Sequence, residues 1–256
     1  MQKDGTQQDE RQKGERIAKR IARAGVCSRR DAERLIADGR VELDGKKVTA
    51  PATLVTAAAR IVIDGVALPA AEPTRLWCYH KPPGVICTSR DPEGRPTVFD
   101  RLPDDLPRLI LIGRLDFTSE GLLLLTNDGA LARRLELPAS GWIRRYRVRV
   151  FGRPDADSLA ALAGGVTVDG IEYGPIEAAI DRAQGDNAWL RVSFREGKNR
   201  EVRRVMEHLG LRVNRLIRTA FGPFRLDNLP SDGIREASRK MVSEALGRGM
   251  HDDADK

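Results

Sequence analysis

The sequence of 256 residues is poor in cysteine and histidine, with only three of each. Cys27, Cys78 and Cys87 form no CxxC pair, and no histidine stands in an HExxH or a CxxC…H spacing. So few cysteines cannot build a disulfide framework in a chain of this length, and the ligand spacings of zinc sites are missing. We therefore expect chemistry that runs without a metal.

Long apolar runs are also missing. Runs such as residues 122–125 are only of strand length, whereas a membrane-spanning helix needs about 20 apolar residues. Residues 1–5 lack the apolar segment of a secretory signal peptide, and the phosphate-binding patterns GxxxxGK[ST] and GxGxxG do not occur. These absences exclude a membrane protein, predict a cytoplasmic location and give no support to a nucleotide cofactor.

Positive charge is the property that the sequence does have, with 44 Lys+Arg against 37 Asp+Glu. It is concentrated in residues 1–50, with 13 basic and 9 acidic side chains, and in residues 191–225, with 10 and 3. Most of the basic residues are arginines, whose planar guanidinium binds phosphate through two hydrogen bonds and stacks on bases. The pattern favours a nucleic-acid partner, although other anionic partners use similar patches.

Two short helices and a hairpin are predicted near the N-terminus. Apolar residues recur at helical spacing from Ile17 and stop at Gly25, and a second such stretch follows Ser28, a capping residue. The pair Asp44-Gly45 favours a tight turn between two strands. Residues 15–70 are therefore expected to form a small ααβ-rich domain.

A larger domain is predicted over residues 75–242. Its strands do not alternate regularly with helices, which favours a mixed, mostly antiparallel sheet and an α+β fold class. The polar ends, residues 1–14 and 247–256, are expected to be disordered. The predicted strands are residues 77–80, 109–112, 122–126, 146–150 and 189–194, and the predicted helices are residues 130–135, 155–163 and 200–209.

The first domain resembles a known RNA-binding module. The string Ala24-Gly-Val-Cys-Ser-Arg-Arg-Asp31, followed by Gly39-Arg-Val41 and Asp44-Gly45, is similar to the S-four type module of ribosomal proteins and RNA-modifying enzymes. The resemblance implies that the two helices bind structured RNA through phosphate and shape contacts; alternatively, they only support the hairpin. The expected RNA-binding residues are Arg16, Lys19, Arg23, Ser28, Arg29, Arg30 and Arg34.

The second domain carries an aspartate in an unusual setting. Taken alone, Asp116 in Arg114-Leu-Asp116 is an ordinary turn residue. With Thr118, Gly121 and Thr126-Asn-Asp-Gly129, however, the string resembles the catalytic signature of the RsuA/RluB/RluE/RluF family of pseudouridine synthases. The resemblance implies a second domain of pseudouridine synthase type.

Three further segments resemble motifs of that family in order and spacing. They are Lys81-Pro-Pro-Gly84, Tyr146 within Arg145-Tyr-Arg-Val, and the string from Glu196 to Met206. Each also has an ordinary structural interpretation: a Pro-Gly turn, a tyrosine that packs across strands, and a helix with a solvated basic face. Because all of them occur together, the resemblance extends from Arg16 to about residue 240.

The resemblance also implies residue roles. Asp116 would be the nucleophile or base, with Arg203 paired to it and Arg114 nearby to keep the carboxylate charged, and Tyr146 would stack on the target base. The expected catalytic residues are Asp116, Arg114, Tyr146 and Arg203. The expected substrate-binding residues are Val202, Lys81, Gly84, Lys198 and Arg200. The family reaction, an isomerisation of uridine, uses no cofactor.

The segment from Arg215 to Leu226 is most like the RluB branch, which implies a uridine of 23S ribosomal RNA near the peptidyl-transferase region. Large-subunit ribosomal RNA, free or in an assembling particle, is therefore the expected partner of a monomeric protein. Leu137-Pro138 and Arg145 depart from the His-Pro and Lys of many relatives. The alternative is a non-catalytic RNA-binding ribosome-assembly protein, which would not need an aspartate in a groove that attracts phosphate.

Overall fold

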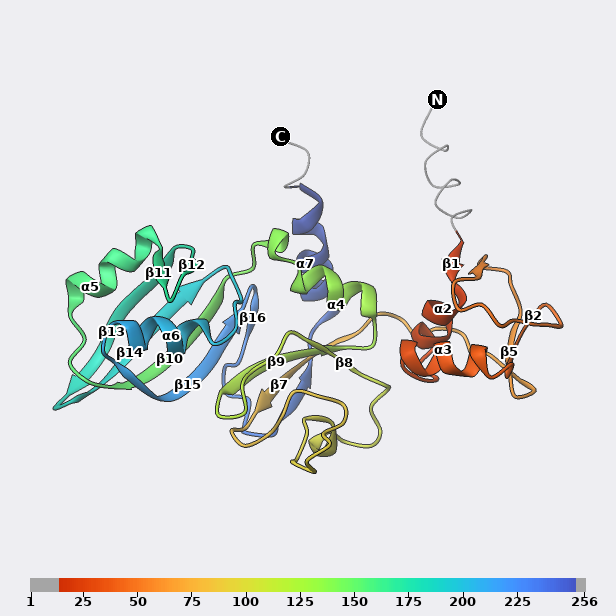
Figure 1. Ribbon diagram of the computed structural model, residues 1–256, viewed down its shortest axis with the longest axis horizontal. Helices are drawn as coiled ribbons and strands as arrows, with labels where there is room; N and C mark the ends of the chain where they lie inside the picture. The colour runs from red at the N-terminus through yellow and green to blue at the C-terminus, as the bar shows by residue number, and fades with distance from the viewer. Residues whose placement is uncertain (1–13, 252–256) are drawn as a thin grey trace. The chain divides into compact units, whose positions relative to one another are not determined.

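A computed structural model describes residues 14–251 of the chain. The chain divides after Thr74 into two compact units, which are described separately below (Figure 1). Residues 1–13 and 252–256, which belong to the ends expected to be disordered, lie outside the described residues. The helix α7 (Arg239–His251) runs through residues 247–251, where the sequence analysis expected disorder.

The first unit contains the two predicted helices, α2 (Ile17–Arg23) and α3 (Arg29–Ala37). Ser28 caps α3, because its side chain accepts a hydrogen bond from the backbone N–H of Asp31 at 3.1 Å. Both helices contribute to one apolar core, which includes Ile17 and Ile36. The strands of this unit are β1 (Glu15–Arg16), β2 (Val41–Leu43), β3 (Lys46–Lys47), β4 (Leu54–Val55), β5 (Ile61–Ile63) and β6 (Val66–Ala67).

The predicted hairpin joins β2 to β3. Asp44 and Gly45 have φ angles of 49° and 79°, as a two-residue hairpin turn requires. A four-stranded sheet forms in the order β3-β2-β5-β6, and β1 pairs with β4. The predicted small domain of two helices and short strands is thus the observed one.

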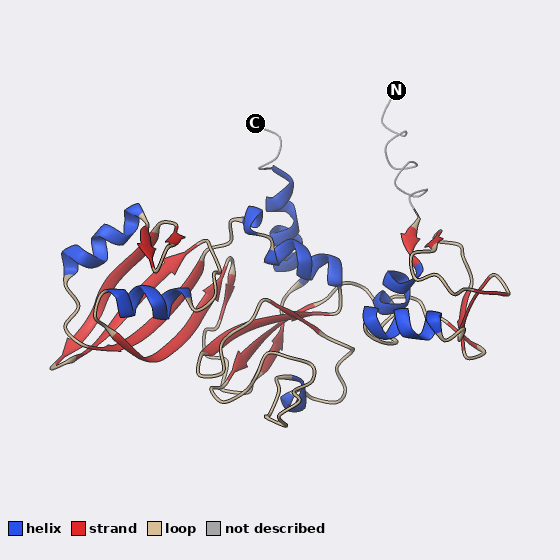
Figure 2. Ribbon diagram, in the orientation of Figure 1, coloured by secondary structure: helices blue, strands red, loops and turns tan. Residues whose placement is uncertain are grey.

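The second unit is built on a nine-stranded sheet, drawn in red in Figure 2. The order is β13-β14-β10-β15-β9-β7-β17, with β16 paired to β15 and β8 paired to β9. In the described part of the chain, only β9 and β15 pair in parallel within this sheet, so the mixed, mostly antiparallel α+β architecture is confirmed. The strand bounds are β7 (Leu76–Lys81), β8 (Ile110–Ile112), β9 (Glu120–Thr126), β10 (Arg144–Phe151), β13 (Ile176–Gln184), β14 (Asn187–Phe194), β15 (Arg212–Phe221), β16 (Phe224–Arg225) and β17 (Ile234–Glu236).

Two apolar clusters attach helices to this sheet. The helix α6 (Glu201–His208) buries Val202 and Met206 in the larger cluster, which also contains Leu190 of β14 and a residue of α5 (Ala156–Ala161). Figure 1 shows α6 lying across the strands β10, β14 and β15. A second cluster joins α4 (Gly129–Glu136) and α7 to β7 and β9. The unit also contains the short hairpin β11 (Val166–Val168) and β12 (Ile171–Tyr173) and the 3-10 turns η1 (Phe99–Arg101), η2 (Pro138–Ser140) and η3 (Leu162–Gly164).

Two long strands were not predicted. β15 carries arginines at positions 212, 215 and 218, so its sequence looks like a basic tail, yet it lies between β10 and β9 near the middle of the sheet. β13 is mostly exposed and lies at the edge of the sheet, where little apolar alternation is needed. Gly121 permits the close approach of β9 to β15, because a Cβ there would lie 2.4 Å from the carbonyl oxygen of Arg218.

Candidate active site

A pocket of about 460 Å³ opens in the second unit. Its walls come from the loop between β8 and β9, from β10 and β15, and from the segment that leads into α6. Six of the residues predicted from the sequence line it: Arg114, Asp116, Tyr146, Lys198, Arg200 and Val202. The fold therefore brings together side chains that lie far apart in the sequence.

Asp116 lies in a loop that is fixed at several points. The carbonyl oxygen of Asp116 accepts a hydrogen bond from the N–H of Ser119 at 3.0 Å, which closes a tight turn. Upstream, the N–H of Gly113 donates to Glu136 Oε1 at 2.7 Å. Leu115 is buried in the core, while the Asp116 side chain keeps an exposed fraction of 29%. The loop thus presents a partly solvated carboxylate on a rigid support.

Lys81 and Gly84 lie beneath this loop. The Lys81 side chain is fully buried, and its Nζ donates to the carbonyl oxygens of Ser119 at 2.8 Å and Pro82 at 2.9 Å. Burial lowers the pKa of Lys81. The N–H of Gly84 donates to the carbonyl oxygen of Phe117 at 2.7 Å. Both residues were predicted to bind substrate, but these contacts use their polar groups to hold the loop.

Two arginines approach the Asp116 carboxylate. Arg200 Nη1 lies 3.5 Å and Arg203 Nε lies 3.6 Å from Asp116 Oδ2. Arg203 Nη2 also donates to Thr118 Oγ1 at 3.0 Å, and the side chain of Arg203 is only 13% exposed. Burial and the neighbouring Arg200 lower the pKa of Arg203. Two positively charged groups therefore lie beside Asp116.

Arg114 differs from these two. It is exposed at the pocket wall, and among the described ion pairs none joins Arg114 to Asp116. Its predicted place near the carboxylate is therefore occupied by Arg200, which was predicted only as a substrate-binding residue. Arg200 has a φ of 51°, a left-handed backbone conformation, at the position that precedes α6. From this position its side chain reaches Asp116.

An aromatic wall faces the same space. Tyr146 of β10 stacks on Phe194 of β14, with ring centroids 5.3 Å apart and ring planes 3° apart. Val202 of α6 is 5% exposed and lines the pocket beside them. A flat apolar surface of this kind suits a planar base.

Two pocket arginines were missed by the sequence analysis. The guanidinium carbons of Arg144 and Arg218 lie 4.8 Å and 5.5 Å from the ring centroid of Phe221. Arg218 is only 3% exposed, and its Nε donates to the carbonyl oxygen of Leu122 at 2.7 Å. The sequence signal was weak, because the face to which a strand residue points is known only once the strand itself is recognised.

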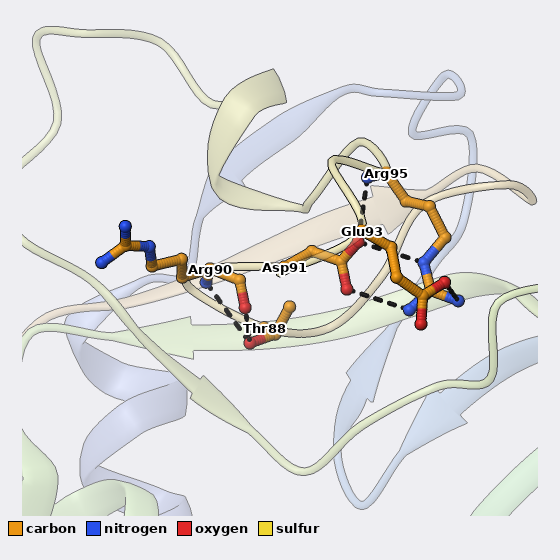
Figure 3. A network of polar contacts seen from close by, with 5 residues as sticks. All are labelled: Thr88, Arg90, Asp91, Glu93 and Arg95. Atoms are coloured by element: carbon orange, nitrogen blue, oxygen red, sulfur yellow. Dashed lines mark hydrogen bonds and ion pairs between the residues drawn. The ribbon is translucent and has the colours of Figure 1, made fainter.

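A structured loop follows Ile86 and Cys87, which contribute to the wall of the pocket. Figure 3 shows how Asp91 holds this loop: its carboxylate accepts hydrogen bonds from the backbone N–H and the guanidinium of Arg95, all between 2.9 and 3.1 Å. These hydrogen bonds lower the pKa of Asp91. The side chain of Glu93 pairs with the same guanidinium at 2.9 Å.

Glu201 is a buried carboxyl group at the start of α6. It is 3% exposed, its Oε2 accepts a hydrogen bond from the N–H of Lys198 at 2.9 Å, and its Oε1 has no hydrogen-bond partner among the described residues. Burial raises the pKa of Glu201 to about 7. In the unfolded chain the pKa of a glutamate is about 4.3. Between these two pKa values the native protein therefore keeps a proton on Glu201 that the unfolded chain has released.

This difference predicts a pH-dependent effect of Glu201→Gln. Between about pH 4.3 and pH 7 the wild-type protein loses stability as the pH rises, because the unfolded chain ionises more readily, whereas glutamine does not titrate. Across this range the free energy of unfolding of the variant should therefore rise relative to that of the wild type by on the order of 4 kcal/mol, and the difference should stay level above pH 7. Denaturant unfolding at several pH values measures this, with exposed Glu207→Gln as the control; equal behaviour of both variants would contradict the prediction.

The residues predicted to bind RNA lie on the helices of the first unit and at their ends. Arg16, Lys19, Arg23, Arg29, Arg30 and Arg34 are all exposed. Arg23 pairs with Glu15, Arg29 with Glu33 and Arg34 with Asp31. Ser28 caps α3, and its predicted contact with RNA stays a prediction. The exposed arginines leave a cationic surface on the two helices.

No group of three or more His, Cys, Asp or Glu side chains within residues 14–251 is arranged to hold a metal ion. Over the same residues, no helix combines the length and the apolar character that crossing a membrane requires.

Comparisons with known proteins agree with this geometry. Residues 75–208 match the family model described as RNA pseudouridylate synthase, and residues 15–61 match the S4 domain. A Rickettsia bellii protein named "Uncharacterized RNA pseudouridine synthase" is 50% identical over 227 residues, which cover 89% of this chain and 98% of that protein. Ribosomal large subunit pseudouridine synthase B of Yersinia pestis is 44% identical over 240 residues, which cover 90% of this chain and 74% of that protein.

A solved structure shows the same fold. The crystal structure of a pseudouridylate synthase aligns with a TM-score of 0.64 at 24% sequence identity, covering 90% of this chain and 99% of the other. The family model spans the segments that form the pocket around Asp116, except for β15. The chain therefore belongs to the RNA pseudouridylate synthase family and is an RNA pseudouridine synthase that carries an S4 domain.

Proposed function

We propose that this enzyme isomerises one uridine of large-subunit ribosomal RNA and that Asp116 is the reacting carboxylate. The observation that carries the proposal is the position of Asp116, which lies in the pocket with two guanidinium groups 3.5 and 3.6 Å from Oδ2. Similar proteins from Yersinia pestis and Salmonella typhi, each 44% identical, are named ribosomal large subunit pseudouridine synthase B. Their names support the choice of RNA.

The reaction breaks the bond between N1 of uracil and C1′ of ribose and forms a bond between C5 and C1′. The base turns between these steps, and the proton on C5 is released to solvent. Asp116 acts on the sugar as a nucleophile or on the nucleoside as a base. Either role requires the charged carboxylate, and Arg200 and Arg203 lie 3.5 and 3.6 Å from its Oδ2.

The target base must leave its stack in the RNA to reach Asp116. The Tyr146 ring, stacked on Phe194, offers it a flat surface, and Val202 limits the space on the α6 side. Lys198 and Arg200 lie at the same pocket and are placed to attract the phosphates that flank the base. Lys81 and Gly84 contribute by holding the Asp116 loop.

Release of tritium from RNA labelled at C5 of uridine tests the proposal. Transcripts of large-subunit and small-subunit ribosomal RNA, and partly assembled particles, are used separately. Release from large-subunit RNA or its particles supports the proposal. Release only from small-subunit RNA contradicts the choice of substrate, and no release from any of them favours a non-catalytic RNA-binding protein.

The S4 domain provides a separate prediction. Arg29→Ala with Arg30→Ala should weaken the binding of ribosomal RNA and reduce the log–log salt slope of the affinity by about 1 to 2 units. The reason is that the variant makes fewer phosphate contacts, so fewer counterions are released when it binds. Filter binding between roughly 50 and 200 mM salt measures this. Lys46→Ala with Lys47→Ala, on the exposed strand β3, removes the same charge and is the control. A slope equal to that of the wild type would contradict a role for α3.

A further inference from the structure

The face of the sheet that lies opposite the pocket is rich in arginine. Along β10, Arg147 and Arg149 are exposed while Tyr146, Val148 and Val150 are buried. Side chains alternate between the two faces of a strand, so these arginines point away from the pocket that Tyr146 lines. We call this the outer face and define it by Arg147, Arg149, Arg182, Trp189, Arg191 and Arg215.

The strand register places like charges side by side on the outer face. Arg147 is directly opposite Arg191 of β14, and Arg149 is directly opposite Arg215 of β15. Like charges in such positions destabilise a sheet. Asp181 offsets the first pair, lying 3.2 Å from Arg147 and 3.7 Å from Arg191.

In the second pair, only Arg215 has an acidic partner. Arg215 forms two hydrogen bonds with Glu120, at 2.6 and 3.0 Å. Arg149 and the exposed Arg182 have no carboxylate partner among the ion pairs of the described residues. These two guanidinium groups are therefore available to an external anion.

The two free guanidinium groups border a hollow of about 400 Å³. Arg149, Arg182, Gln184, Asn187 and Trp189 line it. The guanidinium of Arg147 lies over the Trp189 ring, 4.7 Å from its centroid. The hollow thus combines cations for phosphate, amide groups that hydrogen-bond base edges, and a guanidinium–indole stack that can continue onto a base.

We propose that the outer face binds a segment of the substrate RNA, with phosphates at Arg149 and Arg182 and an unpaired base at the hollow. The proposal rests on the proposed function for the identity of that RNA. An acidic protein surface would satisfy the charge, but it would leave the stacking surface and the side-chain amides without a matching group. The outer face is then a second contact, separate from the pocket, that increases the affinity without taking part in the reaction.

Arg149→Gln with Arg182→Gln tests the proposal. Because neither arginine has a carboxylate partner among the described residues, the change leaves no buried charge unpaired. The affinity for the RNA that releases tritium should fall about 5- to 20-fold near physiological salt, and the log–log salt slope should fall by about 1.4 to 1.8 units. The kcat at saturating RNA should stay within about 2-fold, because the pocket is untouched.

The matched control is Arg133→Gln with Arg239→Gln, which removes the same charge from exposed positions on α4 and α7. A salt slope that matches the wild type in Arg149→Gln with Arg182→Gln, or an equal loss in the control, would overturn the proposal. Tritium release by the wild-type protein is measured on the same RNA. Release together with an unaffected outer-face variant overturns only the proposal for the outer face, whereas absence of release contradicts the proposed function.

A spectroscopic readout at the hollow complements the affinities. Subtracting the fluorescence of Trp189→Phe from that of the wild-type protein isolates the signal of Trp189 from those of Trp77 and Trp142. Binding of the RNA should change this difference signal and shield it from acrylamide. RNA binding that leaves both unchanged would place the RNA elsewhere and overturn the proposal.

Discussion

Replacement of Asp116 by asparagine is expected to reduce tritium release from large-subunit ribosomal RNA at least roughly 10⁴-fold, as for other enzymes that lose a reacting side chain. Asparagine keeps the shape of the side chain, so the loop turn and its bond from Ser119 to the Asp116 carbonyl should persist. The amide cannot carry the negative charge that both mechanistic roles require. RNA affinity should stay within about 3-fold, because phosphate contacts dominate binding.

Single-turnover tritium release and filter binding on the same RNA measure the two effects. Asp105→Asn, at an exposed position of the second unit, is the matched control and should leave both unchanged. Activity of Asp116→Asn within about 10-fold of the wild type would assign the reaction to another group and end the proposed role of this carboxylate.

Replacement of Arg203 by leucine is expected to have the second largest effect, a fall in kcat of about 100-fold. The variant loses the positive charge 3.6 Å from Asp116 Oδ2 and the hydrogen bond to Thr118 at 3.0 Å. Because Thr118 belongs to the loop that carries Asp116, the carboxylate loses both a charge partner and a positional constraint. Arg203→Lys restores the charge but not the planar fork and should recover only part of the activity.

Arg204→Leu provides the control for Arg203→Leu. Arg204 is the next residue of α6, and it does not line the pocket. Its replacement should leave kcat close to that of the wild type, as measured by single-turnover release at saturating RNA. Equal losses in the two leucine variants would indicate a general effect on α6, and normal kcat in Arg203→Leu would remove Arg203 from the site.

The sequence by itself predicted the local structure well where hydrophobic periodicity is regular. The helices α2, α3 and α6 and the strands β7, β9, β10 and β14 lie where the spacing of apolar residues predicts them. Local periodicity reports on burial of one face of an element. It failed for β13 and β15, since an edge strand and an arginine-rich inner strand lack a clear apolar alternation.

The sequence also identified the family and six residues that line the pocket. Motif spacing singled out Asp116, Tyr146, Val202 and Arg203, and the fold places the first three around one pocket and Arg203 beside Asp116. Their catalytic and binding roles stay predictions until the variants are measured. The order and spacing of the motif residues along the chain are enough to recognise a family and the reaction that the family carries out.

Only the tertiary structure decided which atoms each side chain meets. It buried Lys81 under the Asp116 loop, left Arg114 exposed, and placed Arg144 and Arg218 against Phe221 in the pocket. It also turned Arg144 of β10 to the pocket and Arg147 and Arg149 of the same strand to the opposite face. The physical reason is that hydrogen bonds and ion pairs act over a few ångströms, so their partners are set by strand register and burial between distant segments, which local spacing does not contain.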